Sequence, residues 1–65
     1  MAKSFESNIK KIREDKGYSQ IEFAEKVGIR HWHLCKIENG QSRPSVPLLE
    51  KIARELGIEM RDIFL

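Results

Sequence analysis

The sequence predicts an all-α fold in which five short helices pack into one compact bundle. Two observations carry this prediction. Along the 65-residue chain, apolar residues recur at intervals of three and four, the period of a helix, and no segment alternates in the manner of a strand. Glycines and one turn-forming segment, residues 41–45, divide the chain into short pieces joined by short connections. A chain of this length lies near the lower size limit for folding without disulfides, so we expect residues 1–65 to form a single domain.

The first helix is predicted from Phe5, Ile9 and Ile12, which recur at positions i, i+4 and i+7. This spacing places the three side chains on one face of a helix. We expect the helix to begin at residue 4 or 5 and to end at Lys16, because Gly17 follows.

The second helix has a start signal and a stop signal. Ser19 is followed three residues later by Glu22, the spacing of a capping box, so the helix is expected to begin at Gln20. Gly28 stands where a left-handed C-terminal cap is needed. Between these signals the apolar stripe consists of Phe23, Ala24 and Val27.

The third helix is expected from Arg30 or His31 to Glu38. Leu34 and Ile37 lie three residues apart and are expected to face inward. A large aromatic residue such as Trp32 beside a cation such as Lys36 is costly to expose unless it meets a partner, although partial burial of Trp32 against a neighbouring helix is an alternative. The opposite side of this helix carries Trp32, Lys36 and Asn39, flanked by His31 and Cys35.

The last two helices follow the turn segment. Ser45 followed by Pro47 marks a helix start, and the fourth helix is expected from Val46 to Leu56, before Gly57. A short fifth helix is expected over residues 59–64. The apolar stripe of the fourth helix consists of Leu48, Leu49, Ile52, Ala53 and Leu56, and the fifth carries Met60, Ile63 and Phe64.

Two short amphipathic helices around a glycine are the layout of a helix-turn-helix, which points to DNA. The net charge of +2 and the pI near 8.9 are too mild to establish a nucleic-acid partner, so the distribution of charge has to decide. Arg30 and Lys36 lie on the third helix and Arg43 in the loop after it. The single cysteine, Cys35, forms no internal disulfide, and no stretch has the length of a signal or membrane segment, so we expect a cytoplasmic protein.

An ordered set of phrases resembles the Cro/C1-type (XRE) helix-turn-helix family of phage repressors and small bacterial regulators. The resemblance covers nearly the whole chain, and the spacing of the phrases makes it specific. It implies a lambda-repressor-like DNA-binding domain, encoded by a bacterium or a phage, that regulates transcription from the nucleoid. The phrases are Asn8-Ile-Lys-Lys-Ile-Arg13, Gly17-Tyr-Ser-Gln20, Phe23-Ala-Glu-Lys-Val-Gly-Ile29, Lys36-Ile-Glu-Asn-Gly40, Pro44-Ser45, Leu48-Leu-Glu-Lys-Ile-Ala53 and Leu56-Gly57.

The resemblance also assigns roles to particular residues. The third helix is implied to enter the major groove of an operator, most simply as a repressor that blocks a promoter, although activation is equally compatible. Two residues, Arg13 and Glu38, match positions that in relatives form a partly buried ion pair between the first and third helices. The chain departs from the family at Arg30, where a Ser or Thr usually caps the third helix. The implied base readers are Arg30, His31, Trp32 and Lys36, and the implied phosphate contacts are Gln20, Asn39 and Arg43.

The family also implies a homodimer that binds two half-sites. The apolar chain end is the candidate interface, with the alternative that Ile63 and Phe64 only close the core of a monomer. The candidate interface residues are Met60, Ile63, Phe64 and Leu65.

Other functions fit the sequence less well. His31 and Cys35 share a helical face, but two ligands do not close a zinc site, so no metal or cofactor is expected. No nucleophile, base and orienting residue stand at plausible positions, so we expect no enzyme, and neither a small-molecule ligand nor a membrane partner is indicated. The main alternative is a protein-binding module of the same fold that uses Trp32 as its anchor.

Overall fold

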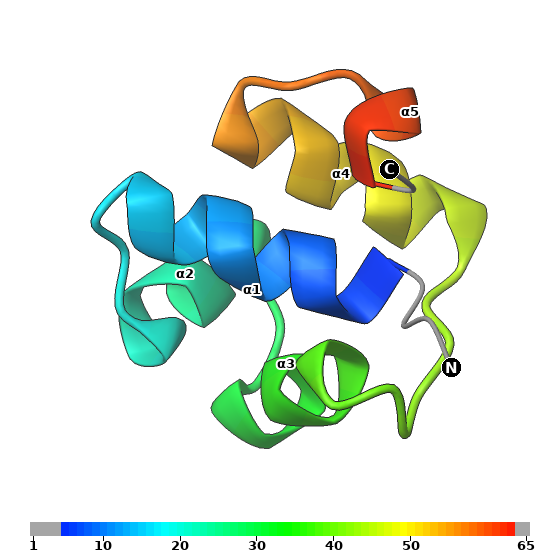
Figure 1. Ribbon diagram of the computed structural model, residues 1–65. Helices are drawn as coiled ribbons and strands as arrows, with labels where there is room; N and C mark the ends of the chain where they lie inside the picture. The colour runs from blue at the N-terminus through cyan, green and yellow to red at the C-terminus, as the bar shows by residue number, and fades with distance from the viewer. Residues whose placement is uncertain (1–4, 64–65) are drawn as a thin grey trace.

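The computed structural model describes residues 5–63, and their side chains from Asn8 to Ile63. These residues form five helices and no strand: α1 (Phe5–Asp15), α2 (Gln20–Val27), α3 (His31–Glu38), α4 (Val46–Leu56) and α5 (Met60–Ile63). Figure 1 shows them gathered around a common centre, with extents of 29 × 23 × 22 Å. The predicted all-α bundle is therefore confirmed.

Two helices are shorter than predicted. The first ends at Asp15 rather than Lys16, because the chain turns at Gly17, which has a φ of 84°. The last helix begins at Met60 rather than Glu59. The backbone N–H of Glu59 donates to the carboxylate of Asp62 at 3.2 Å, so Glu59 precedes the helix and is held to its first turn by this side chain. Its predicted end, Phe64, lies outside the described residues.

The core is built from every helix. The helix α1 packs against α3 and α5, α2 against α3 and α4, and α4 against α5. Burial of these apolar side chains is the main stabilising contribution to a bundle of this size. The largest fully buried side chains are Ile9, Phe23, Val27, Leu34, Ile37, Ile52, Leu56 and Ile63.

The turn between α2 and α3 sets the angle between these helices. Gly28 has a φ of 86°, and its N–H donates to the carbonyls of Ala24 at 2.8 Å and Glu25 at 3.2 Å. The N–H of Ile29 also donates to Ala24 at 3.0 Å, which satisfies carbonyls that the end of α2 leaves unpaired. Arg30 is extended, with φ −77° and ψ 151°, and the next helix begins after it.

Within residues 5–63, no helix has the length and apolar character needed to cross a membrane.

Candidate nucleic-acid interface

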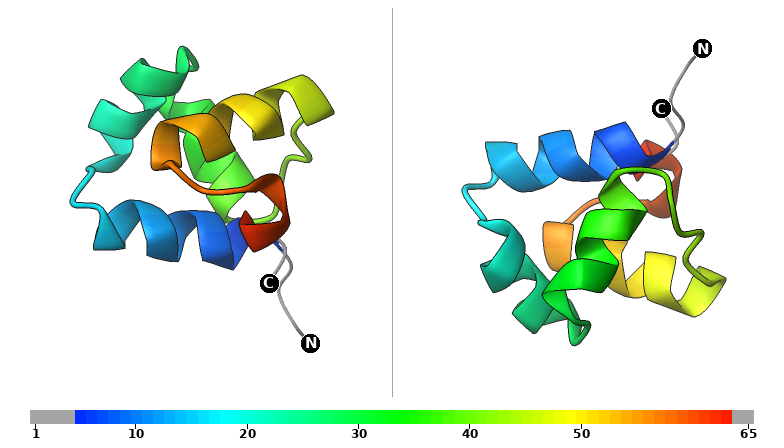
Figure 2. Two further views of the ribbon diagram at one scale, coloured as in Figure 1. Left: turned by 90° about the horizontal axis from the view of Figure 1, so that it is seen from above. Right: turned by 90° about the horizontal axis from the view of Figure 1, so that it is seen from below.

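The helix α3 has one buried face and one exposed face. Leu34 and Ile37 are fully buried in the core, as predicted, whereas Trp32 is 61% exposed. The right-hand view of Figure 2, from below, shows α3 lying across the outside of the bundle. The predicted base readers Arg30, His31, Trp32 and Lys36 are all exposed.

Trp32 is exposed and is not among the partly buried apolar residues that pack against the core, so the structure does not support the alternative of its partial burial. Its ring stacks on that of His33, with centroids 5.5 Å apart and an interplanar angle of 27°. A stacked pair of rings on the outside of a helix leaves a large apolar surface free to meet a partner.

The start of α3 lacks a side-chain cap from its N-cap residue. Arg30 occupies the N-cap position and makes no side-chain capping hydrogen bond, in keeping with its lack of an acceptor. The start of this helix therefore carries no side-chain cap beside the positive charge of Arg30, an arrangement that favours a nearby anion.

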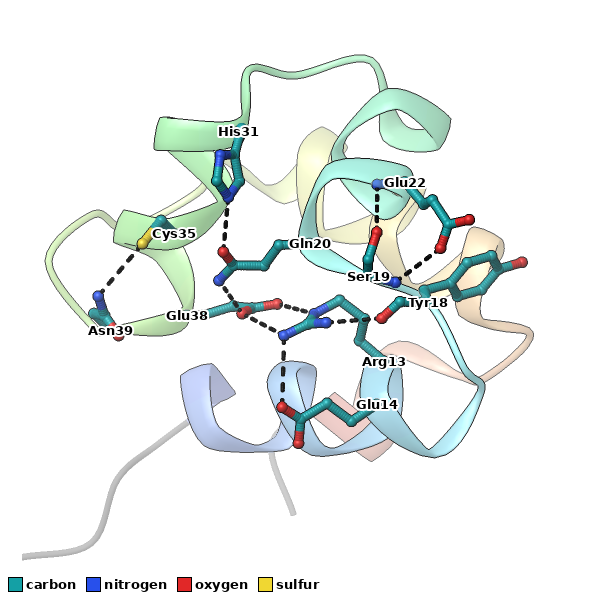
Figure 3. Close-up of polar contacts among 10 residues, drawn as sticks. All are labelled: Arg13, Glu14, Tyr18, Ser19, Gln20, Glu22, His31, Cys35, Glu38 and Asn39. Carbon is teal, nitrogen blue, oxygen red and sulfur yellow. Dashed lines mark hydrogen bonds and ion pairs between the residues drawn. The ribbon is translucent and has the colours of Figure 1, made fainter.

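Beneath the exposed face lies the predicted ion pair. The Nε of Arg13 donates to Oε2 of Glu38 at 2.7 Å, and Nη2 donates to Oε1 at 3.1 Å. The third donor, Nη1, bonds the carbonyl of Tyr18 at 2.8 Å. Both charged residues are 5% exposed. The pair fixes α3 to α1 and to the chain just before α2 (Figure 3).

Gln20 extends this network to the start of α3. Its Nε2 donates to Oε1 of Glu38 at 2.9 Å, and its Oε1 lies 2.8 Å from Nε2 of His31. Figure 3 shows the four residues as one continuous chain of polar contacts from α1 to the first residue of α3. The family resemblance implied only a phosphate contact for Gln20 and did not indicate this role. The available signal was the buried carboxylate of Glu38, which has more acceptor positions than one arginine fills.

The other residues expected to contact phosphates lie near the end of α3. Asn39 ends this helix and is exposed, with its Nδ2 3.7 Å from Sγ of Cys35. Arg43 is exposed in the loop that leads to α4. Gln20 lies at the opposite side, as the first residue of α2, and is half-buried.

The start of α2 is held by a complete capping box. The hydroxyl of Ser19 accepts from the N–H of Glu22 at 3.1 Å, and Oε1 of Glu22 accepts from the N–H of Ser19 at 3.0 Å. Two interactions lower the pKa of Glu22 below its ordinary value of 4.5. The larger is the hydrogen bond with the backbone of Ser19, and the smaller is the one with the Ser19 side chain. The position of Gln20 therefore rests on a locally determined helix start.

At one position of the candidate dimer interface, Ile63, the structure bears out the alternative that this residue closes the core. The side chain of Ile63 is fully buried in the core, since α5 packs against both α1 and α4, and so it is unavailable to a second subunit. Met60 is half-buried against the same core. Phe64 and Leu65 lie outside the described residues.

Among the described residues, no three His, Cys, Asp or Glu side chains are grouped to hold a metal ion. His31 and Cys35, the two residues that share a helical face, instead contact Gln20 and Asn39.

Comparison with known proteins places this geometry in a family. A helix-turn-helix family model matches residues 9–63. The curated transcriptional regulator SinR of Bacillus subtilis is 41% identical over 56 residues, which cover 85% of this chain and 50% of SinR. The chain thus spans about half the length of this relative.

Solved structures of related proteins have the same fold. The restriction-modification controller C.AhdI of Aeromonas hydrophila superposes with a TM-score of 0.88 at 32% identity, covering 92% of this chain and 91% of that protein. The structure of SinR in complex with DNA superposes with a TM-score of 0.83 at 38% identity, covering 91% of this chain and 95% of the SinR chain. The family is one of DNA-binding regulators rather than enzymes. The fold, the residues matched and these relatives together show that the chain belongs to the Cro/C1-type (XRE) helix-turn-helix family of transcriptional regulators.

Proposed function

We propose that this protein binds duplex DNA sequence-specifically and regulates transcription by placing α3 in the major groove. The observation that carries the proposal is the division of α3 into a buried face, tied to α1 by the Arg13–Glu38 pair, and an exposed face. A helix with this arrangement presents its outer side chains to base edges while its inner side fixes its position. The relative SinR, whose structure includes DNA, supports the same function.

The exposed side chains of α3, and that of its N-cap residue Arg30, have suitable base partners. Lys36 donates to O6 and N7 of guanine, and Arg30 has the same chemistry with a planar group that suits two acceptors. The ring of Trp32 presses on a thymine methyl group or on a sugar. Because Trp32 and His33 form a bulky pair, the depth to which α3 enters the groove is set by this stack.

Phosphate contacts on both sides of α3 hold the helix in register. Gln20 offers its second Nε2 proton beside the unpaired N–H groups of the first turn of α2, which favour an anion. Asn39 and Arg43 serve the opposite flank. These contacts contribute affinity and orientation without reading sequence.

The most direct mode of regulation is repression by blocking a promoter. One recognition helix covers few base pairs, so we propose a homodimer on two half-sites about one DNA turn apart. Met60 and the chain end, Phe64 and Leu65, are its proposed contacts. The proposal places the protein in the cytoplasm of a bacterium, on the nucleoid.

Selection of bound duplexes from a random pool, followed by footprinting, tests the proposal. We expect an enriched site with two-fold symmetry and an affinity that falls with salt, with a log-log slope of about −0.9 for each phosphate neutralised. Failure to bind any duplex at low salt would overturn it. A protein-binding module anchored by Trp32 would instead show binding to a protein partner with little dependence on salt.

A further inference from the structure

We propose that His31 recognises an exocyclic amino group in the major groove, N6 of adenine or N4 of cytosine, through its Nδ1 atom. This inference rests on the proposed function and specifies the chemistry of one contact. It follows from the directions of the hydrogen bonds that join Arg13, Glu38, Gln20 and His31.

The directions at the buried end are fixed by chemistry. The guanidinium of Arg13 only donates, and the Glu38 carboxylate accepts from it at both oxygens. The amide of Gln20 must then present its NH₂ group to Oε1 of Glu38, because two oxygens at 2.9 Å would repel each other. The orientation of the Gln20 amide is thus determined by the ion pair.

The direction at His31 follows. With its NH₂ group on Glu38, Gln20 turns its carbonyl oxygen toward His31, 2.8 Å from Nε2. A carbonyl oxygen only accepts, so Nε2 of His31 carries the proton. In a neutral imidazole one nitrogen is a donor and the other an acceptor, so Nδ1 carries a free lone pair.

The free nitrogen lies on the outer side of the interface. His31 is exposed and is the first residue of α3, where the side chains of a recognition helix contact base edges. Figure 3 shows its second ring nitrogen on the side of the ring away from Gln20. Among the described residues, no hydrogen bond occupies Nδ1.

An acceptor at this place selects between bases. In the major groove, adenine and cytosine each offer an amino group, whereas guanine offers O6 and N7 and thymine offers O4, all of them acceptors. Neutral His31 therefore favours adenine or cytosine and disfavours guanine. Gln20 acts as a positioning residue for this contact.

The first test uses the free protein and does not depend on DNA. Nuclear magnetic resonance at low temperature and about pH 8, above the ordinary titration range of histidine, should show a slowly exchanging Hε2 proton on His31. His33 is the matched control on the same helix, since no hydrogen bond holds its ring among the described residues. Gln20→Ala should abolish the His31 signal and leave the fold intact by thermal unfolding. A protonated Nδ1, or a signal that survives Gln20→Ala, would overturn the proposal.

The second test uses the selected DNA site. Adenine is replaced by purine, or cytosine by 2-pyrimidinone, at each position of a half-site, so that only the amino group is removed. At one position the wild type should lose about fivefold in affinity, as expected for one hydrogen bond, whereas His31→Ala should lose nothing further and Gln20→Ala should lose less than the wild type. The base that responds distinguishes adenine from cytosine.

The outcomes separate the two proposals. Absence of binding to every duplex overturns the proposed function itself. Binding in which His31→Ala responds to the removed amino groups as the wild type does overturns only the assignment of His31.

Discussion

Arg13 and Glu38 form a two-point ion pair between α1 and α3, with Nε to Oε2 at 2.7 Å and Nη2 to Oε1 at 3.1 Å. Both side chains are buried, so the pair lies beneath the exposed face of α3 rather than on the surface. The desolvation of two charges offsets much of their attraction. The pair therefore acts mainly by fixing α3 in one position, and the loss of one partner is costly.

We expect Glu38→Ala to lower the free energy of unfolding by about 3–5 kcal/mol, because it leaves a buried guanidinium without its partner. Urea unfolding followed by circular dichroism measures this change. The matched control is Glu14→Ala, since the Glu14 carboxylate is 3.9 Å from Arg13 and its side chain is 57% exposed; it should change stability by less than about 1 kcal/mol. Equal effects of the two substitutions would contradict the structural role of the pair.

Gly28→Ala should destabilise the protein by about 1–2 kcal/mol, because the φ of 86° is unfavourable for a residue with a Cβ atom. Space is not the cause, since the added Cβ would meet only Nζ of Lys51, at 3.4 Å, the end of a flexible side chain. Gly57→Ala is a comparison without any neighbour within 4 Å and should cost a similar amount. Thermal unfolding of both variants tests this; no loss at Gly28 would show that the turn relaxes.

The capping box makes part of the stability depend on pH. The folded-state pKa of Glu22 lies below its ordinary value of 4.5, so its contribution is fully present above 4.5 and is lost as the pH falls through the lowered folded-state pKa. Glu22→Gln should be less stable than the wild type near neutral pH, and the difference should shrink as acid protonates Glu22. Urea unfolding of both proteins between about pH 2.5 and 7 measures it. A constant difference over this range would refute the assignment.

Removal of the Lys36 side chain and removal of the Arg43 side chain should affect DNA binding differently. Lys36→Ala should lose about 1–3 kcal/mol of discrimination at one base position, because it removes donors from a base edge. Arg43→Ala should weaken binding to all sequences alike and reduce the magnitude of the salt slope by about 1. Competition binding with a set of single-base variants measures both effects. Arg54→Ala, which removes an exposed charge in the last turn of α4, controls for the loss of one positive charge. Identical behaviour of the first two variants would remove the distinction between base reader and phosphate contact.

The sequence predicted those features that short segments determine. The capping pattern of Ser19 and Glu22 and the stop at Gly28 depend on neighbouring residues, so both ends of α2 were predicted correctly. The Arg13–Glu38 pair was predicted from family resemblance, since the two residues are far apart in the chain.

Two features that depend on the packing between helices could not be determined from the sequence. The contact of Gln20 with His31 spans 11 residues and forms only at the observed angle between α2 and α3. Similarly, an apolar residue near a chain end has the same sequence pattern whether it faces the core or a second subunit. Ile63 faces the core, and only the packing of α5 against α1 and α4 reveals this.

The stack of Trp32 on His33 also gives the molecule an optical property. The chain contains a single tryptophan, and it stands on the exposed face of α3. The tryptophan fluorescence therefore comes from α3 alone, without background from a tryptophan in the core. Transfer of this indole from water to a groove or to another protein changes its emission, so unlabelled protein reports directly on occupancy of that face.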